Sequence, residues 1–375
     1  TQYPSLITPK QSIGKSQEGR DIWAVKISDN PGIDEQEPEV YFDGLIHARE
    51  PQSMMTLLYF MMNLLEQYGK DPELTYLVDN REIWFVPVHN PDGYVYNEVH
   101  YGWGGMWRKN RRNNPGSCYG VDLNRNYDIN FGGVGSSSDE CDDTYHGQYA
   151  FSEPEAAGYA DFVGDHEFVT NISFHSVASL ILLPWGYTYS HTPDDALFRE
   201  IGNIMSETNG YPVGQAGEVL YLASGTTTDW LYAAHDVFSY TVEIGGSGFW
   251  PSESELPGLV AENLWPQQII TRIAGDYLAL EDAALTGGDG DGEPDAGETL
   301  DLTVTIENQA LAGAVANTQV TLATGDPYVQ LHDASSSLGS IPARSSASNA
   351  GDPFSFTVDA STPDAHQLTL TLVIT

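Results

Sequence analysis

The sequence predicts an α/β fold whose mixed, mostly parallel sheet is flanked by helices, followed by a small all-β sandwich. The first observation is an alternation of strand-like and helix-like segments from Ile22 to about Ala284, which favours an α/β layer arrangement. The second is a change near Leu285 to short alternating strands. The length of 375 residues also suits two domains, at roughly 100 to 200 residues each. We therefore expect one domain over residues 1–284 and another over 285–375.

The elements of the first domain follow from the spacing of apolar residues. Residues 40–42 form a short run of β-type residues, and Pro51 then opens a stretch with apolar residues at helical spacing up to Leu65. Proline suits the first position of a helix, so a long helix is expected from residue 51. Further strands are expected at 83–88, 171–174, 180–183 and 240–244, and helices near 153–164, 194–208 and 260–282.

The second domain begins with a glycine-rich breaker segment, residues 287–292. Apolar residues then alternate with polar ones at 300–306, 354–358 and 368–372, which is typical of strands with one buried face. Arg344 is the only Lys or Arg in residues 286–375. No helical segment of useful length is expected there, so we predict a small antiparallel sandwich.

Composition excludes several classes of function. Lys plus Arg is 15 and Asp plus Glu is 53, so the net charge is 15 − 53 = −38, which repels nucleic acid and anionic lipid. Hydrophobic residues make up 41%, enough for a packed core. No run of 18 apolar residues occurs, so no membrane span is expected. We expect a globular monomer that does not bind nucleic acid.

The two cysteines, Cys118 and Cys141, indicate a compartment. They are too few for a disulfide scaffold or a cysteine-based zinc site, and Gly, Ser, Asn and Asp surround them. A disulfide that ties a loop in an exported protein is one interpretation, and a pair of free thiols is the other. With the disulfide, the protein is expected to be secreted or to lie at the cell surface.

Three side chains could bind a metal ion. His47 and Glu50 lie three residues apart between a predicted strand and a predicted helix, where both can point at one ion. His175 ends an apolar strand, the place where α/β folds put their sites. Taken one by one, His47 and Glu50 fit an ordinary surface turn better than a metal site, and His175 fits a hydrogen-bonded core histidine better than a metal ligand.

The few basic residues of the chain include a group that could bind an anion. A guanidinium offers a planar fork that matches a carboxylate, so this grouping favours the binding of an anion. The alternative is that these side chains merely pair with the abundant Asp and Glu. The gathered residues are Arg49, Arg108, Lys109, Arg111, Arg112 and Arg125.

A set of ordered motifs points to a known family. In order they are SQEGR (16–20), HARE (47–50), NPDG (90–93), MWRKN (106–110), GVDLNRN (120–126), FSEPE (151–155), SFHS (173–176), LYLASG (220–225), DW (229–230) and YTVE (240–243). In their order and spacing, the chain from Ile13 to about Ala284 resembles the zinc carboxypeptidases of the pancreatic carboxypeptidase A type and their secreted bacterial relatives such as carboxypeptidase T. Cys118 and Cys141 also fall where the disulfide of that family lies.

The resemblance implies a zinc-dependent exopeptidase that removes the C-terminal residue of peptides or proteins. His47, Glu50 and His175 would bind one Zn²⁺ and leave a position for water. Glu243 would be the general base that takes a proton from this water and passes it to the leaving amine. Arg108 would polarise the scissile carbonyl.

The resemblance also implies how substrate is bound. Asn124, Arg125 and Tyr221 would hold the free C-terminal carboxylate, and Arg49 would lie along the approaching chain. Thr228 stands where relatives that cleave basic residues carry Asp, so apolar, aromatic or broadly neutral C-terminal residues are expected. The implied pocket lining is Leu182, Gly186, Ala216, Ala223, Thr226, Thr228 and Thr241, none of them acidic.

Two other functions remain compatible with the motifs. The same scaffold and zinc could act on cell-wall peptides or acylated amino acids, or the chain could be an inactive binding protein that kept the fold. Val177 also stands where pancreatic relatives have Tyr, which changes the outer contacts to substrate.

An acidic segment opens the second domain. Asp289, Asp291, Asp295 and Glu298 place oxygen ligands at nearby positions, as calcium loops do. Pro294 stands at the sixth position, where an EF-hand needs glycine, so the segment is not an EF-hand. Calcium binding and a plain acidic linker turn both fit.

Overall fold

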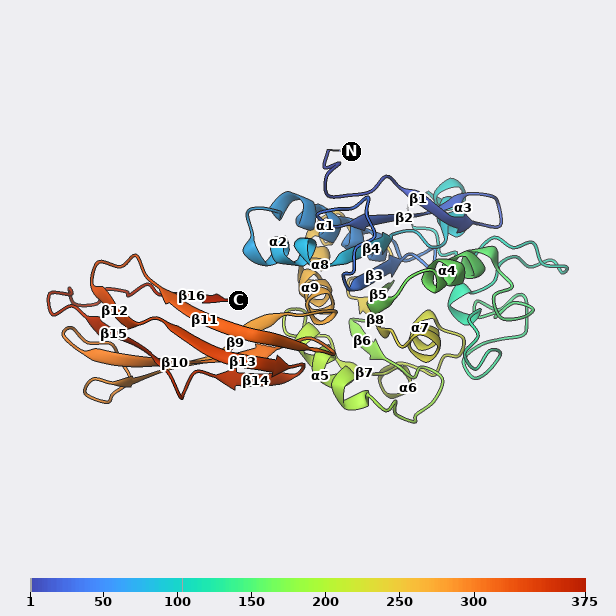
Figure 1. Ribbon diagram of the computed structural model, residues 1–375. Helices are drawn as coiled ribbons and strands as arrows, with labels where there is room; N and C mark the ends of the chain where they lie inside the picture. Colours follow the sequence, from blue (N-terminus) through green and yellow to red (C-terminus); the bar gives the residue numbers. More distant parts are fainter. Residues whose placement is uncertain (1, 103) are drawn as a thin grey trace. The chain divides into compact units, whose positions relative to one another are not determined.

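The computed structural model describes residues 2–102 and 104–375 (Figure 1). The chain divides into two compact units, Thr1–Ala274 and Gly275–Thr375. The second unit begins ten residues before the boundary expected at residue 285. The reason is that β9 (Leu278–Gly287) pairs along its whole length with β10 (Thr299–Asn308), so both strands belong to one sheet.

The first unit is built on an eight-stranded mixed sheet in the order β1-β2-β4-β3-β5-β8-β6-β7. The centre, β4-β3-β5-β8, is parallel, whereas β2 on β4 and β6 on β8 are antiparallel. The expected mixed sheet is therefore confirmed. The strands are β1 (Gln11–Lys15), β2 (Asp21–Ile27), β3 (Glu39–Gly44), β4 (Glu82–Val86), β5 (Phe168–Ser176), β6 (Leu180–Leu183), β7 (Val213–Gln215) and β8 (Phe238–Ile244).

Most helices begin where proline or a capping side chain favours it. Pro51 is the first residue of the long α1, as expected, and Asn90 accepts a hydrogen bond from the Gly93 N–H at the start of α3. Among the described residues no helix is long and apolar enough to cross a membrane. The helices are α1 (Pro51–Gln67), α2 (Pro72–Asp79), α3 (Pro91–Tyr101), the 3₁₀ turn η1 (Leu123–Arg125), α4 (Pro154–Gly164), α5 (Asp195–Met205), α6 (Ala216–Val219), α7 (Thr227–His235), α8 (Leu256–Glu262) and α9 (Leu264–Ile273).

The helix expected at 260–282 was wrong in its extent. The structure ends α8 at Glu262, starts α9 at Leu264, ends α9 at Ile273 and continues as strand β9. Asn263 separates the two helices, and its amide donates back to the Leu259 carbonyl. The apolar residues after Ile273 alternate and pair with β10, so strand pairing takes precedence over the helical spacing there.

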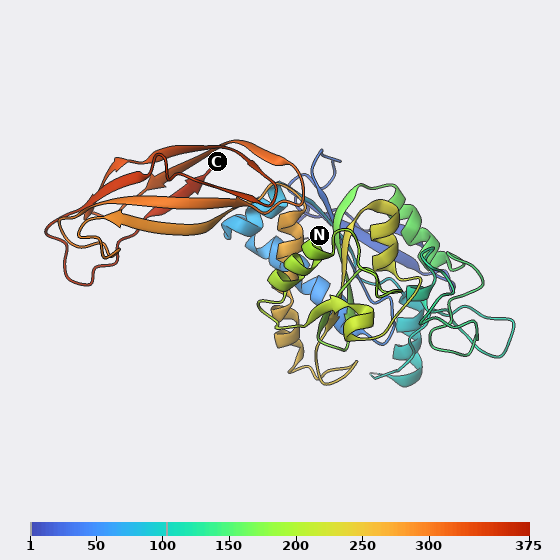
Figure 2. The same cartoon turned by 90° about the horizontal axis from the view of Figure 1, so that it is seen from below.

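Helices cover both faces of the sheet (Figures 1 and 2). Neighbouring residues of β3 point to opposite faces, as alternate strand positions do. Phe42 packs on Phe60 of α1, with ring centroids 5.6 Å apart, whereas Tyr41 packs on Tyr159 and Phe162 of α4. The sheet is therefore the middle layer. The side chains of its buried strands can reach a ligand only at the ends of the strands.

The carboxyl ends of the parallel strands β3, β5 and β8 meet at one edge of the sheet. His47 follows β3, His175 lies near the end of β5, and Glu243 lies near the end of β8. The strand register pairs His175 with Glu243 directly. This edge is where an α/β sheet places a site.

The second unit consists of antiparallel strands in two sheets. One sheet has the order β12-β15-β10-β14 with β9 also on β10, and the other is β13-β11-β16. Side chains of both sheets, such as Phe356 and Leu322, form one buried cluster. The third strand lies further along the chain than the expected 368–372, because β16 spans Thr371–Ile374, although Leu368 and Leu370 still pack against this cluster. The remaining strands are β11 (Ala314–Ala323), β12 (Val329–Asp333), β13 (Ser335–Pro342), β14 (Ser345–Ser348), β15 (Phe354–Val358) and β16 (Thr371–Ile374).

Glu155, in the first turn of α4, is an acidic residue whose pKa is changed by burial. It is fully buried and accepts hydrogen bonds from the Gln17 N–H at 3.0 Å and the Asn110 amide at 3.1 Å. Burial raises the pKa of Glu155 from 4.5 to about 7. The folded protein therefore keeps the proton that the unfolded chain releases above pH 4.5, and this stabilisation is lost as pH rises through about 7.

We expect Glu155→Gln to weaken this pH dependence. Between pH 5 and pH 8 the unfolding free energy of the wild type should fall by about 2 to 3 kcal/mol more than that of the variant. Urea unfolding of both proteins at the two pH values measures the difference. Equal slopes in the two proteins would show that Glu155 titrates normally.

Candidate metal and substrate site

Three donor side chains converge at the edge where β3 and β5 end. His47 Nδ1 lies 2.9 Å from one carboxylate oxygen of Glu50, and His175 Nδ1 lies 3.1 Å from the other. The two Nδ1 atoms are 3.0 Å apart. All three residues are at most 3% exposed. Glu50 immediately precedes α1, so the strand-to-helix turn aims both His47 and Glu50 at one point.

The carboxylate of Asp122 contacts one of the three donors, His47, and the guanidinium of Arg108. One oxygen of Asp122 lies 3.2 Å from His47 Nε2 and the other accepts from Arg108 Nη2 at 2.8 Å. With the proton of His47 on Nε2, facing Asp122, the Nδ1 lone pair faces Glu50 and His175. The sequence identified Asp122 only as part of a motif, so its role was missed.

The electrostatics of the cluster favour charged carboxylates. Burial alone would raise the pKa of Glu50, but His47 and His175 outweigh it and hold the pKa well below its usual range. Burial likewise opposes ionisation of Asp122, but Arg108 keeps the pKa of that carboxyl well below normal. Burial, followed by Arg108, lowers the pKa of His47. The lowered pKa of His47 favours its neutral imidazole, which is the form that binds a metal.

The donor set fits a divalent metal ion. Two imidazole nitrogens and one carboxylate are the ligands of catalytic zinc, which keeps a position open for water. The ligand atoms of the three residues all lie within 4.8 Å of one another. Two other acidic groups among the described residues meet the same distance limit, but neither contains histidine.

Glu243 lies beside this cluster on β8. Its side chain lines the same cavity as the three donors. Burial raises the pKa of Glu243 to about 7, although the neighbouring His175 acts in the opposite direction. A carboxyl group with a pKa near neutrality can both accept and return a proton.

Arg125 and Asn124 are held rigidly by η1 and the surrounding loops. Arg125 Nε donates to the Gly135 carbonyl at 2.8 Å, and Nη1 donates to the Asn124 carbonyl at 2.6 Å. The Asn124 side-chain oxygen accepts from the Thr227 N–H at 2.9 Å. These bonds leave guanidinium N–H groups of Arg125 for a ligand in the cavity.

Two predicted residues lie at the rim. Tyr221 is 52% exposed and still lines the cavity. Arg49 stacks on Phe249, with 4.6 Å between guanidinium and ring centroid, and lies 3.3 Å from an oxygen of Asp143. Phe249 was not predicted, because no pattern in the sequence links it to Arg49.

The cavity has a volume of about 240 Å³ and brings together all the predicted zinc-binding, catalytic and substrate-binding residues. Thr228 and Thr241 lie 2.7 Å apart, oxygen to oxygen. The lining also includes Asp229, which corrects the expectation of a lining without acidic residues. Both oxygens of Asp229 accept from the Gly186 N–H, at 2.9 and 2.8 Å, so this carboxyl group already has a partner.

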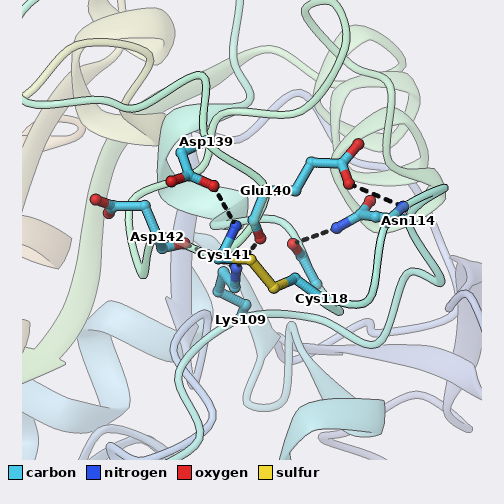
Figure 3. The surroundings of a disulfide bond; sticks show 9 residues. Lys109, Asn114, Cys118, Asp139, Glu140, Cys141 and Asp142 are labelled. Atoms are coloured by element: carbon cyan, nitrogen blue, oxygen red, sulfur yellow. Dashed lines mark hydrogen bonds between the residues drawn. A yellow bond between two sulfur atoms is a disulfide. The ribbon is translucent and has the colours of Figure 1, made fainter.

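The cysteines form a disulfide, as the first interpretation predicted. Cys118 and Cys141 are joined with 5.1 Å between their Cα atoms (Figure 3). Lys109 reinforces the loop by donating to the carbonyls of Glu140 and Asp142, at 2.9 and 2.7 Å. Arg49 contacts the next residue, Asp143, so this loop reaches the rim of the cavity.

In the acidic segment of the second unit, only three of the four predicted calcium ligands lie close together. Asp289, Asp295 and Glu298 have oxygens close together, but Asp291 does not join them. The Glu298 carboxylate accepts from the N–H groups of Asp289 and Asp295, at 2.7 and 3.1 Å. These bonds give the cluster a purely structural explanation, and calcium binding stays a prediction.

Comparisons with known proteins agree with the geometry. A family model described as zinc carboxypeptidase matches residues 1–265. Carboxypeptidase A4 from Mus musculus is 34% identical over 277 residues, which cover 71% of this chain and 64% of that protein. A zinc carboxypeptidase from Saccharothrix mutabilis subsp. capreolus is 36% identical over 270 residues, covering 68% and 61%. The matched region thus spans about three fifths of the length of these relatives.

Solved structures show the same fold. Carboxypeptidase A from Helicoverpa armigera is 32% identical, with a TM-score of 0.65 over 73% of this chain and 69% of that one. Bovine thrombin-activatable fibrinolysis inhibitor, solved with a tick carboxypeptidase inhibitor, is 30% identical, with a TM-score of 0.65 over 73% and 92%.

Proposed function

Because the chain belongs to the zinc carboxypeptidase family, we propose that it is a zinc-dependent carboxypeptidase that hydrolyses the C-terminal peptide bond of peptides or proteins. One observation carries the proposal. Three metal-binding side chains share one cavity with the partly buried carboxyl group of Glu243 and the guanidinium of Arg125. Metal, base and anion-binding group are thus within reach of a single bound chain end.

His47, Glu50 and His175 would hold the zinc ion. Bound there, zinc supplies Lewis acidity and makes water a better nucleophile near neutral pH. Asp122 keeps the Nδ1 lone pair of His47 directed at the site. The three ligands are supplied by two chain segments that the sheet fixes, so little reorganisation accompanies binding.

Glu243 would move the proton. It accepts a proton from the attacking water and delivers it to the amine that leaves when the peptide bond breaks. Its burial suits both steps, because it keeps the pKa of the carboxyl near neutrality. Arg108, which Asp122 holds in place, would stabilise the negative charge that develops on the carbonyl oxygen.

The free carboxylate of the substrate would bind Asn124, Arg125 and Tyr221. A guanidinium fork pairs with a carboxylate through two parallel hydrogen bonds, which explains a requirement for a chain end. Arg49 would contact the chain upstream of the cleaved bond. Tyr221, half exposed at the rim, would cover the bound end.

The lining of the cavity supports a preference for certain C-terminal residues. Thr228 is neutral, and burial raises the pKa of Asp229 to about 7, so the carboxyl group of Asp229 is not fully charged at neutral pH. Apolar, aromatic or broadly neutral residues are therefore expected, rather than Lys or Arg. The disulfide between Cys118 and Cys141 supports export to an oxidising compartment.

We expect the wild type to hydrolyse an N-blocked dipeptide ending in Phe and to lose this activity in the presence of a zinc chelator. Adding Zn²⁺ back should restore turnover. The same dipeptide with an amidated C-terminus is the matched control and should not be cleaved, because it lacks the carboxylate. Turnover that survives chelation, or equal turnover of the amide, would contradict the proposal. A panel ending in Phe, Leu, Arg and Glu tests the preference, and faster turnover of Arg would overturn it.

A further inference from the structure

Two hydroxyl groups in the cavity have only each other as partners. The oxygens of Thr228 and Thr241 lie 2.7 Å apart. Within the described residues, neither hydroxyl has another hydrogen-bond partner in the protein. Thr228 is 5% exposed and Thr241 is 7% exposed, and both line the cavity. Any further partner must therefore occupy the cavity itself.

Strand β8 places this hydroxyl pair further from the carboxyl edge of the sheet than Glu243 and the metal ligands. Thr241 precedes Glu243 by two residues on β8, so both side chains point to the same face, about 7 Å apart along the strand. Glu243 lies toward the carboxyl edge of the sheet, where the metal ligands are. Thr228 approaches Thr241 from the first turn of α7. The pair therefore lies where the tip of a C-terminal side chain would end.

The two hydroxyl groups keep hydrogen-bonding capacity that their mutual contact does not use. Two hydroxyl groups carry two hydrogens and four acceptor lone pairs, and the contact between them uses one hydrogen and one lone pair. One hydrogen and three lone pairs remain. Leu182 and Ala216, which line the cavity nearby, cannot pair with them. An apolar side chain that displaces water here leaves the hydroxyls unpaired, which costs binding.

We propose that Thr228 and Thr241 together select substrates whose C-terminal side chain carries a hydroxyl group at its tip, so that tyrosine is preferred over phenylalanine. This inference rests on the proposed function. A phenol can both accept the free hydrogen and donate to a lone pair. A site built to pair with a hydroxyl group discriminates against the analogue without it, here by about tenfold or more in kcat/KM.

The test compares N-blocked dipeptides ending in Tyr, Phe and 4-fluorophenylalanine, the last of which has a substituted tip but no donor. The wild type should favour Tyr by about tenfold over both others. Thr228→Val and Thr241→Val each leave one hydroxyl and should keep part of this ratio. The double variant should bring the ratio to about one, mainly by faster turnover of the Phe substrate.

Thr170→Val is the matched control. It also removes a buried hydroxyl, which donates to the Ile270 carbonyl and does not line the cavity. The control should keep the preference for Tyr even if it lowers stability. A wild type with equal kcat/KM for Tyr and Phe, or a double variant that keeps the preference, would overturn the proposal.

Calorimetric binding of N-acetyl-tyrosine and N-acetyl-phenylalanine separates this proposal from the proposed function. If no dipeptide is cleaved but N-acetyl-tyrosine binds more tightly in the wild type and not in the double variant, the selectivity stands and the proposed hydrolysis fails. If both compounds bind equally, or neither binds, the selectivity fails.

Discussion

Glu243→Gln should lower kcat by about 10²- to 10⁴-fold, the range that general acid–base catalysis contributes. Glutamine keeps the size of the side chain but cannot accept a proton from water or return one to the leaving amine. Because Glu243 contributes none of the three converging donors, the zinc content of the variant should equal that of the wild type. Steady-state kinetics and metal analysis of the same samples measure both quantities.

The control for this change is Glu207→Gln, which alters an exposed carboxyl group of the same unit. It should leave kcat and zinc content unchanged. A Glu243→Gln protein that keeps full zinc and full kcat would remove Glu243 from the mechanism. A protein that loses zinc would instead show that Glu243 supports the metal site.

Arg125→Met should lower kcat/KM for a substrate with a free C-terminal carboxylate by about 10²- to 10³-fold, because charge-assisted hydrogen bonds to that carboxylate are lost. Methionine retains much of the aliphatic volume of the arginine. The partners of Arg125 in the protein are backbone carbonyls, so no buried acidic side chain loses its hydrogen bond. Turnover of free-acid and amidated dipeptides should become similar in the variant.

Arg199→Met is the matched control for the loss of a guanidinium. Arg199 pairs with Asp195 and Glu218 and does not line the cavity. Its removal should leave the preference for the free acid intact. An Arg125→Met enzyme that still prefers the free acid as strongly as the wild type would place the carboxylate elsewhere in the cavity.

The sequence was most informative where a signal is local. Pro51 marks the start of α1, and the apolar runs at residues 180–183 and 240–244 correspond to β6 and to the end of β8. Backbone restriction by proline and burial of a continuous apolar run act within a few residues, so they can be seen without the fold. The proximity of the two histidines and Glu50 was inferred from the family resemblance, and the strand order explains it physically.

Features that depend on contacts between residues far apart in the sequence could not be predicted from local patterns. Asp122 acquires its importance from contacts with His47 and Arg108, which lie 75 and 14 residues away in the sequence. The pairing of Thr228 with Thr241 requires α7 to pack beside β8 in one register. The path of the chain after Ile273 was decided by pairing with β10, since the local pattern permits both helix and strand.

The two contacts of Asp122 also bear on how the site responds to motion. One planar carboxylate is bound at one oxygen to His47 and at the other to Arg108, and its own N–H donates to the Tyr145 carbonyl at 2.8 Å. A drift of the segment that carries Asp122 therefore displaces the imidazole and the guanidinium in the same direction. Collective displacement leaves their separation nearly constant, and only relative displacement changes the reaction geometry.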